Sequence, residues 1–367
     1  MKIPRILLAA GASGSGKTLI TCGLLQALVN RKKKVASFKC GPDYIDPMFH
    51  SRVIGTKSRN LDTFFTDADT TRYLLRRNAA DCDIAVMEGV MGFYDGVGGI
   101  STRASAYDLA DTTDTPVILI VNSRGMSISL AAYIKGFMEY KENSHIKGVI
   151  FNQMSPMLYP RMKKLVEEDL KIEVLGYVPK VEDCVIESRH LGLVLPEEIS
   201  DLKERLKKLA AILEGTLEID RILALAQSAP DLNVPESLTA KNGAFGFRTA
   251  HKLRIGVAED EAFCFFYEDN FRLLRKMGAE LVPFSPIHDA HLPSDLDGLL
   301  FYGGYPELNG EALEQNQSMK TEIAQALRDG MPCMAECGGF MYLHEQMEDM
   351  DGISRQTCGV ISGKCYR

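Results

Sequence analysis

The chain has 367 residues, of which 46% are hydrophobic and 25% are charged, as is usual for a soluble globular protein. Its formal net charge of −7 argues against a nucleic-acid partner, because neutralising phosphates requires clustered lysine and arginine. No stretch reaches the roughly 18 to 20 consecutive apolar residues that span a bilayer, and the N-terminus leads into a predicted strand, not a signal peptide. We therefore expect no nucleic acid, no membrane and a cytoplasmic location.

Short apolar runs alternate with helical stretches over residues 1–225, which predicts a parallel sheet covered by helices on both faces. The strands are nearly continuously apolar, as expected for burial on both faces. The expected strands are residues 6–10, 35–38, 84–87, 117–121 and 149–151. The expected helices are residues 18–30, 70–78, 129–139, 160–170 and 199–213. This pattern indicates one doubly wound α/β domain.

Residues 226–250 are polar and punctuated by proline and glycine, so they are predicted to form a linker. A second series of strands and helices starts near Leu253, which predicts a second domain over residues 251–367. The expected organisation is two α/β domains joined by this linker.

Residues 11–18 read GASGSGKT and match the phosphate-loop pattern G-x-x-x-x-G-K-[ST] between an apolar strand and a helix. In such a loop, backbone N–H groups point at the phosphates, the lysine neutralises phosphate charge and the hydroxyl binds Mg²⁺. A chance glycine-rich turn is the alternative, but the motif lies where the mechanism requires it. We expect ATP and Mg²⁺ as cofactors. The residues expected to bind ATP here are Gly14, Ser15, Gly16, Lys17 and Thr18.

Two segments with acidic residues, 39–47 and 88–96, follow predicted strands. In open α/β sheets, ligands lie at the carboxyl ends of the strands, so both segments are expected to face the nucleotide. Asp43 and Glu88 are candidate Mg²⁺ ligands together with Thr18. A turn beside proline is the alternative for Asp43 and for Asp46, whereas the carboxylate of Glu88, which closes an apolar strand, is costly to bury without a partner.

Cys337 lies in residues 335–340, AECGGF, the sharp-turn context of a nucleophile elbow. A cysteine at such a turn can act as a nucleophile, and neighbouring backbone N–H groups can stabilise the oxyanion that forms. A buried cysteine before a Gly-Gly turn is the alternative.

Five segments together resemble the cobyrinic acid a,c-diamide synthase family. They are residues 39–47 (KCGPDYIDP), 88–96 (EGVMGFYDG), 262–267 (AFCFFY), 303–308 (GGYPEL) and 336–343 (ECGGFMYL). The resemblance runs from residue 5 to the C-terminus, and the N-terminal half is also similar, more distantly, to dethiobiotin synthetase. It implies a phosphate-loop synthetase domain followed by a class I glutamine amidotransferase-like α/β domain.

This resemblance implies an ATP- and glutamine-dependent amide ligase of cobalamin biosynthesis. The family phosphorylates the a and c acetate carboxylates of cobyrinic acid, and ammonia attacks the acyl phosphates that result. Lys39, with Lys17, is then expected to stabilise the transferring phosphoryl group. Asp46 and Tyr44 are expected to contact the substrate or the intermediate. The expected partners are cobyrinic acid or a related tetrapyrrole, and glutamine or ammonia.

Further residues receive roles from their position or from the resemblance. Ser101 and Thr102 begin a predicted helix, whose N-terminal amides suit a carboxylate or phosphate of the substrate; a plain helix cap is the alternative. Asn152 closes a predicted strand and resembles the base-reading asparagine of related nucleotide-binding folds. Cys337 matches the amidotransferase nucleophile, and its expected oxyanion donors are the N–H groups of Gly304, Tyr305 and Gly338. The expected catalytic residues are Cys337, Lys39 and Asp46.

The sequence departs from the family after Cys337. Amidotransferases need a histidine to deprotonate the cysteine, and in the family it follows many tens of residues later. His344 follows Cys337 by seven positions and is expected on the next helix, about 10 Å along its axis and out of reach. The second domain is therefore predicted to be incomplete, through C-terminal truncation, as a fragment, or as a form that uses free ammonia. We predict that the chain by itself lacks glutaminase activity.

Three alternatives stay open. A hydrogenobyrinate or nickel-sirohydrochlorin diamide synthase would share every quoted segment. A non-ligase phosphate-loop ATPase, such as a partitioning or scaffold switch protein, would use the same fold without amidation. A degenerate protein would bind only a nucleotide and a partner. A homodimer is compatible with each of these functions.

Overall fold

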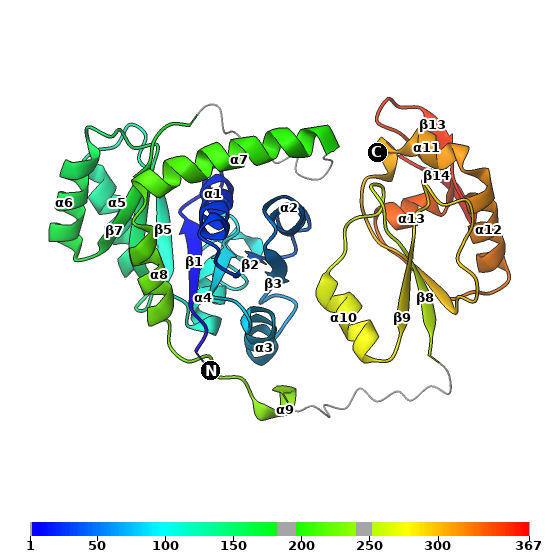
Figure 1. The fold of residues 1–367 in the computed structure, drawn as a ribbon, viewed down its shortest axis with the longest axis horizontal. Helices are drawn as coiled ribbons and strands as arrows, with labels where there is room; N and C mark the ends of the chain where they lie inside the picture. The colour runs from blue at the N-terminus through cyan, green and yellow to red at the C-terminus, as the bar shows by residue number, and fades with distance from the viewer. Residues whose placement is uncertain (1, 182–195, 240–251, 367) are drawn as a thin grey trace. The chain divides into compact units, whose positions relative to one another are not determined.

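The computed structural model describes residues 2–181, 196–239 and 252–366 (Figure 1). The chain divides into two compact units, Met1–Gly243 and Ala244–Arg367. None of the described helices combines the length and apolar character that crossing a bilayer requires.

The first unit is built on a seven-stranded parallel sheet with the strand order β3-β2-β4-β1-β5-β6-β7. The strands are β1 (Arg5–Ala10), β2 (Val35–Cys40), β3 (Lys57–Leu61), β4 (Ile84–Glu88), β5 (Val117–Asn122), β6 (Ile146–Asn152) and β7 (Glu173–Val178). All six residues of β1 and of β2 are buried, as a strand covered on both faces requires. The five predicted strands are confirmed.

Helices cover both faces of this sheet (Figure 1). One face carries α1 (Lys17–Asn30), α7 (Pro196–Thr216) and α8 (Ile219–Ser228); the other carries α3 (Ala68–Ala79), α4 (Ala106–Thr113), α5 (Ser129–Glu139) and α6 (Tyr159–Leu170). Alternate side chains of β1 enter the two cores, since Leu8 packs on the α1 side and Leu7 on the α4 side. The predicted doubly wound α/β fold is confirmed.

Several elements differ from the sequence prediction. Strands β3 and β7 were not predicted, because β3 (KSRNL) is polar and both lie at the edges of the sheet, where burial is incomplete. The prediction that Ser101 and Thr102 begin a helix is wrong. Helix α4 begins at Ala106, and its N-cap is Ser105, whose hydroxyl accepts a hydrogen bond from the N–H of Asp108.

The described part of the predicted linker belongs to the first unit. Helix α8 extends to Ser228, Leu232 is buried in the core on the α4 side, and the short helix α9 (Glu236–Thr239) follows. Residues 240–250 of the predicted linker lie outside the described residues.

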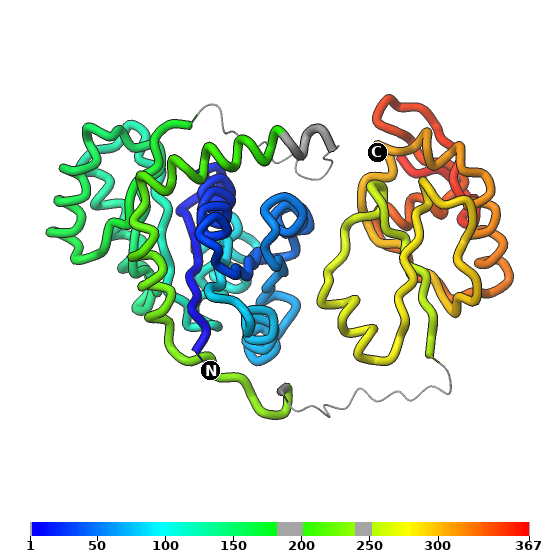
Figure 2. The backbone as a smooth tube through the Cα atoms, in the orientation of Figure 1, coloured from blue at the N-terminus to red at the C-terminus, as the bar shows by residue number. Residues whose placement is uncertain are grey.

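The second unit contains a four-stranded parallel sheet, in the order β11-β10-β8-β9, and a three-stranded sheet, in the order β13-β12-β14. Figure 2 traces it from yellow to red. Its strands are β8 (Arg254–Ala258), β9 (Glu280–Phe284), β10 (Gly298–Phe301), β11 (Cys333–Ala335), β12 (His344–Glu348), β13 (Ser354–Gln356) and β14 (Ile361–Cys365). Its helices are α10 (Glu268–Lys276), α11 (Gly310–Gln315), α12 (Gln317–Arg328) and α13 (Gly338–Tyr342).

The start of β1 is fixed by a buried arginine. The guanidinium of Arg5, which is fully buried, donates hydrogen bonds to the carbonyl oxygens of Ile3, Thr113 and Asp114 and to the hydroxyl of Thr115. One side chain thus ties β1 to the end of α4, on the side of the sheet opposite to α1.

We expect Arg5→Met to lower the free energy of unfolding by about 2 to 4 kcal/mol, because the buried acceptors lose their donor. Arg31→Met is the matched control: Arg31 is only partly buried and pairs with Glu214 and Asp220 at the surface, so its loss is expected to cost less than about 1 kcal/mol. Urea unfolding followed by circular dichroism measures both. Equal losses in the two variants would contradict the role given to Arg5.

Candidate functional site

The phosphate loop leads from the buried strand β1 into α1. Gly14 and Gly16 have φ angles of 74° and 90°, in the left-handed region that favours glycine. A Cβ built on Gly16 would lie 2.3 Å from Nδ2 of Asn152, so that position also has no room for a side chain. The conformation of the loop therefore depends on these two glycines.

Asn152, at the end of β6, supports the loop directly. Its Nδ2 donates a hydrogen bond of 2.8 Å to the carbonyl oxygen of Ser15, and only 4% of the residue is exposed. The side chain thus contacts the loop that holds the phosphates. Its predicted contact with a base stays a prediction.

Lys17 connects the loop to the segment after β4. It is 8% exposed, and its ammonium donates hydrogen bonds to the carbonyl oxygens of Ala12 and Met91. Burial lowers the pKa of Lys17, and the nearby carboxylate of Glu88 partly opposes this effect. The ammonium of Lys17, which would neutralise a phosphate group, is therefore held beside the loop.

A buried cluster of charges lies at the carboxyl ends of β2 and β4. The Nζ of Lys39 is 2.8 Å from Glu88 Oε1 and 3.9 Å from Asp43 Oδ2, and it also pairs with the carboxylate of Asp46. The hydroxyl of Thr18 donates to the same Glu88 oxygen at 2.6 Å. Burial alone would lower the pKa of Lys39, but Glu88 and Asp46 outweigh it and raise that pKa, so Lys39 stays charged.

Two of the predicted site residues, Asp43 and Asp46, stabilise the structure of this cluster. Asp43 Oδ1 accepts hydrogen bonds from the N–H groups of Ile45 and Asp46, at 2.8 and 3.2 Å, which orders the start of α2 (Ile45–Phe49). This is the turn role that the sequence left open as the alternative for Asp43. Asp46 is 7% exposed and paired with Lys39, so it orients the ammonium. Tyr44 is the residue that precedes α2.

His50 is a neighbour of this cluster that sequence reasoning missed. It is fully buried at the start of a π-helix (His50–Ile54), and its Nε2 is 3.6 Å from both Glu88 Oε2 and Cys22 Sγ. Burial lowers the pKa of His50 to about 4, so the ring is neutral near pH 7. A single histidine without a metal-ligand spacing gives no signal in the sequence; only the fold brings it beside Glu88.

The residues around Thr18 fit a magnesium ion that also takes phosphate oxygens. Glu88 Oε2 is buried and has no hydrogen-bond partner among the described residues, and Glu88 Oε1 lies 2.6 Å from the Thr18 hydroxyl. Mg²⁺ typically takes one or two protein oxygens and completes its shell with phosphate and water. Within residues 2–181, 196–239 and 252–366, no three His, Cys, Asp or Glu side chains could hold a metal by themselves.

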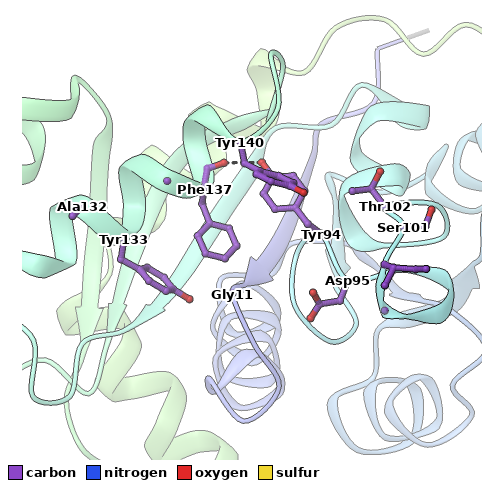
Figure 3. A pocket seen from close by; sticks show the side chains of 12 residues that line it. Gly11, Tyr94, Asp95, Ser101, Thr102, Ala132, Tyr133, Phe137 and Tyr140 are labelled. Atoms are coloured by element: carbon purple, nitrogen blue, oxygen red, sulfur yellow. Dashed lines mark hydrogen bonds between the residues drawn. The ribbon is translucent and has the colours of Figure 1, made fainter.

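A cavity of about 540 Å³ opens beside the phosphate loop (Figure 3). Gly11, the first residue of the loop, lines it, and so do the predicted substrate-binding residues Ser101 and Thr102. The Ser101 hydroxyl accepts a hydrogen bond from the N–H of Arg103 at 3.1 Å. The structure thus brings Ser101 and Thr102 to the phosphate loop, although they lie in a loop and not in a helix. Tyr44 is not among the lining residues.

Cys337 lies at the turn between β11 and α13, in the second unit. Its φ of 50° and ψ of −118° are strained for a residue with a side chain, as at a nucleophile elbow, and it is exposed. A Cβ built on Gly303 would lie 3.5 Å from Cys337 Sγ, and one built on Gly338 would lie 2.7 Å from Pro306. Backbone packing at glycine positions therefore holds the turn in place.

The three predicted oxyanion donors differ in availability. The N–H of Tyr305 donates to the carbonyl oxygen of Ala262 at 2.9 Å, so it does not point at the thiol. Within the described part of the chain, the N–H groups of Gly304 and Gly338 donate no hydrogen bond. A Cβ built on Gly338 would lie 3.3 Å from the nitrogen of Gly304, so these two N–H groups are neighbours.

His344 does not act on the thiol in this structure. It begins strand β12 because α13 ends at Tyr342, so the prediction that it lies on a helix is wrong. Its Nδ1 donates a hydrogen bond of 2.9 Å to the carbonyl oxygen of Phe340. The other described histidines of this unit, His288 and His291, pair with glutamates. Among residues 252–366, no histidine forms a hydrogen bond with Cys337.

We expect Gly16→Ala to weaken nucleotide binding at least ten-fold, because the new Cβ would collide with Asn152 in a left-handed conformation. Gly215→Ala, in α7, is the control, since a Cβ there would meet nothing within 4 Å. Titration with a fluorescent ATP analogue measures both. Unchanged affinity in Gly16→Ala would contradict the loop geometry described here.

A family model matches each of the two units. Residues 6–193 match the family described as the CobQ/CobB/MinD/ParA nucleotide binding domain, and residues 254–366 match the CobB/CobQ-like glutamine amidotransferase domain. The MinD cell division protein of Aquifex aeolicus, a solved structure, is 15% identical, with a TM-score of 0.36 over 63% of this chain and 99% of that chain.

Curated relatives match over nearly the whole chain. The cobyrinate a,c-diamide synthase of Priestia megaterium is 37% identical over 98% of this chain and 77% of that protein. The synthase of the same name from Dehalococcoides mccartyi is 41% identical over 99% of this chain and 78% of that protein. The chain therefore spans about three quarters of the length of these two proteins. The chain belongs to the cobyrinate a,c-diamide synthase family.

Proposed function

We propose that this chain catalyses the ATP-dependent amidation of the a and c acetate carboxylates of cobyrinic acid, in cobalamin biosynthesis. The observation that carries the proposal is the cavity whose lining includes Gly11 of the phosphate loop. A carboxylate bound there would lie next to the phosphates of ATP. Family membership supplies the identity of the carboxylate.

The first unit would perform the phosphoryl transfer. A carboxylate oxygen of the substrate attacks the γ-phosphorus, ADP leaves, and an acyl phosphate forms. Lys17 would neutralise the phosphates, and Lys39, charged because of Glu88 and Asp46, would stabilise the transferring group. Asp46 acts through Lys39 and is a positioning residue.

Thr18 and Glu88 would hold Mg²⁺, as their adjacent oxygens allow. When bound, the ion would neutralise the charge that develops on the phosphates during transfer. Asp43 would contribute a further oxygen to the magnesium site, namely the Oδ2 that faces Lys39. Ammonia then attacks the acyl carbon, and phosphate leaves as the amide forms.

The second unit would release ammonia from glutamine. The Cys337 thiolate would attack the side-chain amide, and the N–H groups of Gly304 and Gly338 would stabilise the oxyanion. This half-reaction needs a base, and no histidine of residues 252–366 forms a hydrogen bond with Cys337. We therefore propose free ammonia as the nitrogen source for this chain by itself. A cytoplasmic location and a homodimer remain predictions.

We expect the purified chain, with ATP, Mg²⁺ and cobyrinic acid, to form the diamide with ammonium chloride and not with glutamine. Mass spectrometry of the product measures this, and Cys337→Ala is expected to leave the ammonia-dependent rate unchanged. Product from glutamine would contradict the second half of the proposal and would require a base from another subunit.

The same assay with hydrogenobyrinic acid and nickel-sirohydrochlorin, beside cobyrinic acid, identifies which tetrapyrrole is the substrate. ATP hydrolysis that proceeds without amide formation and is unchanged by every tetrapyrrole would contradict the ligase assignment and favour a switch ATPase.

We expect Glu88→Gln to lower the ammonia-dependent rate by about 100-fold at fixed Mg²⁺, because the loss of the carboxylate charge weakens the ion's site. Raising the Mg²⁺ concentration is expected to restore part of that rate. Glu139→Gln, at an exposed position near the end of α5, is the control and is expected to behave as the unchanged chain. If Glu88→Gln had the same rate and the same dependence on Mg²⁺ as the control, Glu88 would not be a metal ligand.

A further inference from the structure

One wall of the cavity beside the phosphate loop is aromatic. Tyr94 follows β4, and Tyr133, Phe137 and Tyr140 come from α5 and its end (Figure 3). Neighbouring rings are in contact, with centroid distances of 5.7 Å for Tyr94 and Phe137, 4.9 Å for Tyr94 and Tyr140, and 5.0 Å for Tyr133 and Phe137. We call these four side chains the aromatic wall.

Contacts among its own side chains and backbone hold the aromatic wall in place. The hydroxyl of Tyr94 donates a hydrogen bond of 2.6 Å to the carbonyl oxygen of Phe137, and the rings of these two residues are nearly parallel, at 18°. This bond joins the loop after β4 to α5 across the back of the cavity. Such a preorganised apolar surface binds a flat ligand with little loss of side-chain freedom.

The inner end of the aromatic wall lies on the phosphate loop. A Cβ built on Gly11 would lie 1.8 Å from the hydroxyl oxygen of Tyr133 and 2.7 Å from the ring of Phe137. In Figure 3 the Tyr133 hydroxyl points toward Gly11. Asp95, the acidic residue of the lining, has its Oδ2 bound to the N–H of Gly92 at 3.0 Å. The tyrosine hydroxyl can therefore donate to a carboxylate arm that reaches the phosphates.

The outer end of the cavity is apolar and open. Ile100 is 97% exposed and Tyr140 is 67% exposed, although both are large apolar side chains. The ammonium of Lys141 lies 5.7 Å from the centre of the Tyr140 ring, next to this end. Exposed apolar side chains that line a cavity can contact a ligand, and the adjacent cation suits a ligand that carries carboxylates on an apolar ring.

The size of the cavity decides how much of a tetrapyrrole can enter. At about 540 Å³ it is in the usual range for a ligand pocket, but a tetrapyrrole with all its side arms is larger. One edge of the ring can therefore enter with one acetate arm, while the remainder lies over Ile100 and Tyr140.

We infer that the aromatic wall is the binding site of the tetrapyrrole. Tyr140 contacts the ring, and the Tyr133 hydroxyl orients the carboxylate that is phosphorylated. This inference rests on the proposed function and adds to it the residues that recognise the ring. It separates two tasks within one wall: the outer end binds the macrocycle, and the inner end positions the reacting group.

Three variants of the full chain test this separation. We expect Tyr140→Ala to raise the Kd for cobyrinic acid about ten-fold, with ATP affinity unchanged, because a ring contact is lost. We expect Tyr133→Phe to keep the Kd within about two-fold and to lower the ammonia-dependent kcat about ten-fold, since only the hydroxyl is removed. Tyr73→Ala is the matched control: Tyr73 is on α3 and also lies 5.7 Å from a cation, Arg77.

Equilibrium dialysis, read from the visible absorption of cobyrinic acid, gives the Kd, and circular dichroism checks the fold of each variant. If the unchanged chain binds no tetrapyrrole, the proposed function and this inference both fail. If it binds and Tyr140→Ala binds equally well, only the assignment of the aromatic wall fails. A loss of ATP affinity in Tyr140→Ala equal to its loss of tetrapyrrole affinity would place the nucleotide in this cavity and overturn the inference.

Discussion

The ammonium of Lys39 is the interaction on which the N-terminal site depends. It neutralises the carboxylates of Glu88 and Asp46 at a place where none of the three residues is more than 7% exposed. A buried charge that loses its partner typically costs about 3 to 5 kcal/mol, so the three groups must be present together. The same ion pairs fix the ends of β2 and β4 and aim Glu88 at Thr18. The stability of this region and the geometry of the proposed catalytic site are therefore set by one cluster.

Glycine makes the remaining close contacts of this site possible. The phosphate loop is approached by Asn152 at Gly16 and by Tyr133 at Gly11, both at distances that a Cβ would prevent. The loop thus lies between the amide side chain of Asn152, from β6, and the aromatic ring of Tyr133, from α5. Through these contacts the nucleotide site and the cavity share a boundary, which is what transfer of a phosphoryl group to a bound carboxylate requires.

The sequence predicted those parts of the structure that depend on local pattern. Apolar runs bounded by turns identify β1 and β2, and the G-x-x-x-x-G-K-[ST] pattern identifies the phosphate loop, because these signals lie within a few consecutive residues. Tertiary contacts produce no such pattern. His50 lies beside Glu88 only because the chain folds back after β2, whereas the turn cap of Asp43 is a local contact that the sequence offered as an alternative.

The aromatic wall shows the same limit on a larger scale. Tyr94 lies on a loop, and Tyr133, Phe137 and Tyr140 recur at i, i+4 and i+7 along α5 and its end, a spacing that core-facing helices share and that therefore does not single out a ligand site. His344 was placed on a helix by simple continuation, but the helix that begins after Cys337 is only five residues long. Element boundaries of this kind are set by packing against the rest of the unit and not by propensity.

The elbow at Cys337 indicates how the nitrogen-donating half relates to the ligase half. A residue with a side chain in this strained conformation persists only when its surroundings determine it. Here they consist of Gly303 and Gly338, which allow the backbone to pack against Cys337 and Pro306. None of those contacts involves a histidine, so the geometry of the nucleophile forms independently of its base. Nucleophile placement is thus a property of the fold of the second unit, whereas activation of the thiol is a separate requirement. Under the proposed function, a chain with an intact elbow whose thiol lacks a base would draw its nitrogen from ammonia, because phosphoryl transfer would take place on the first unit.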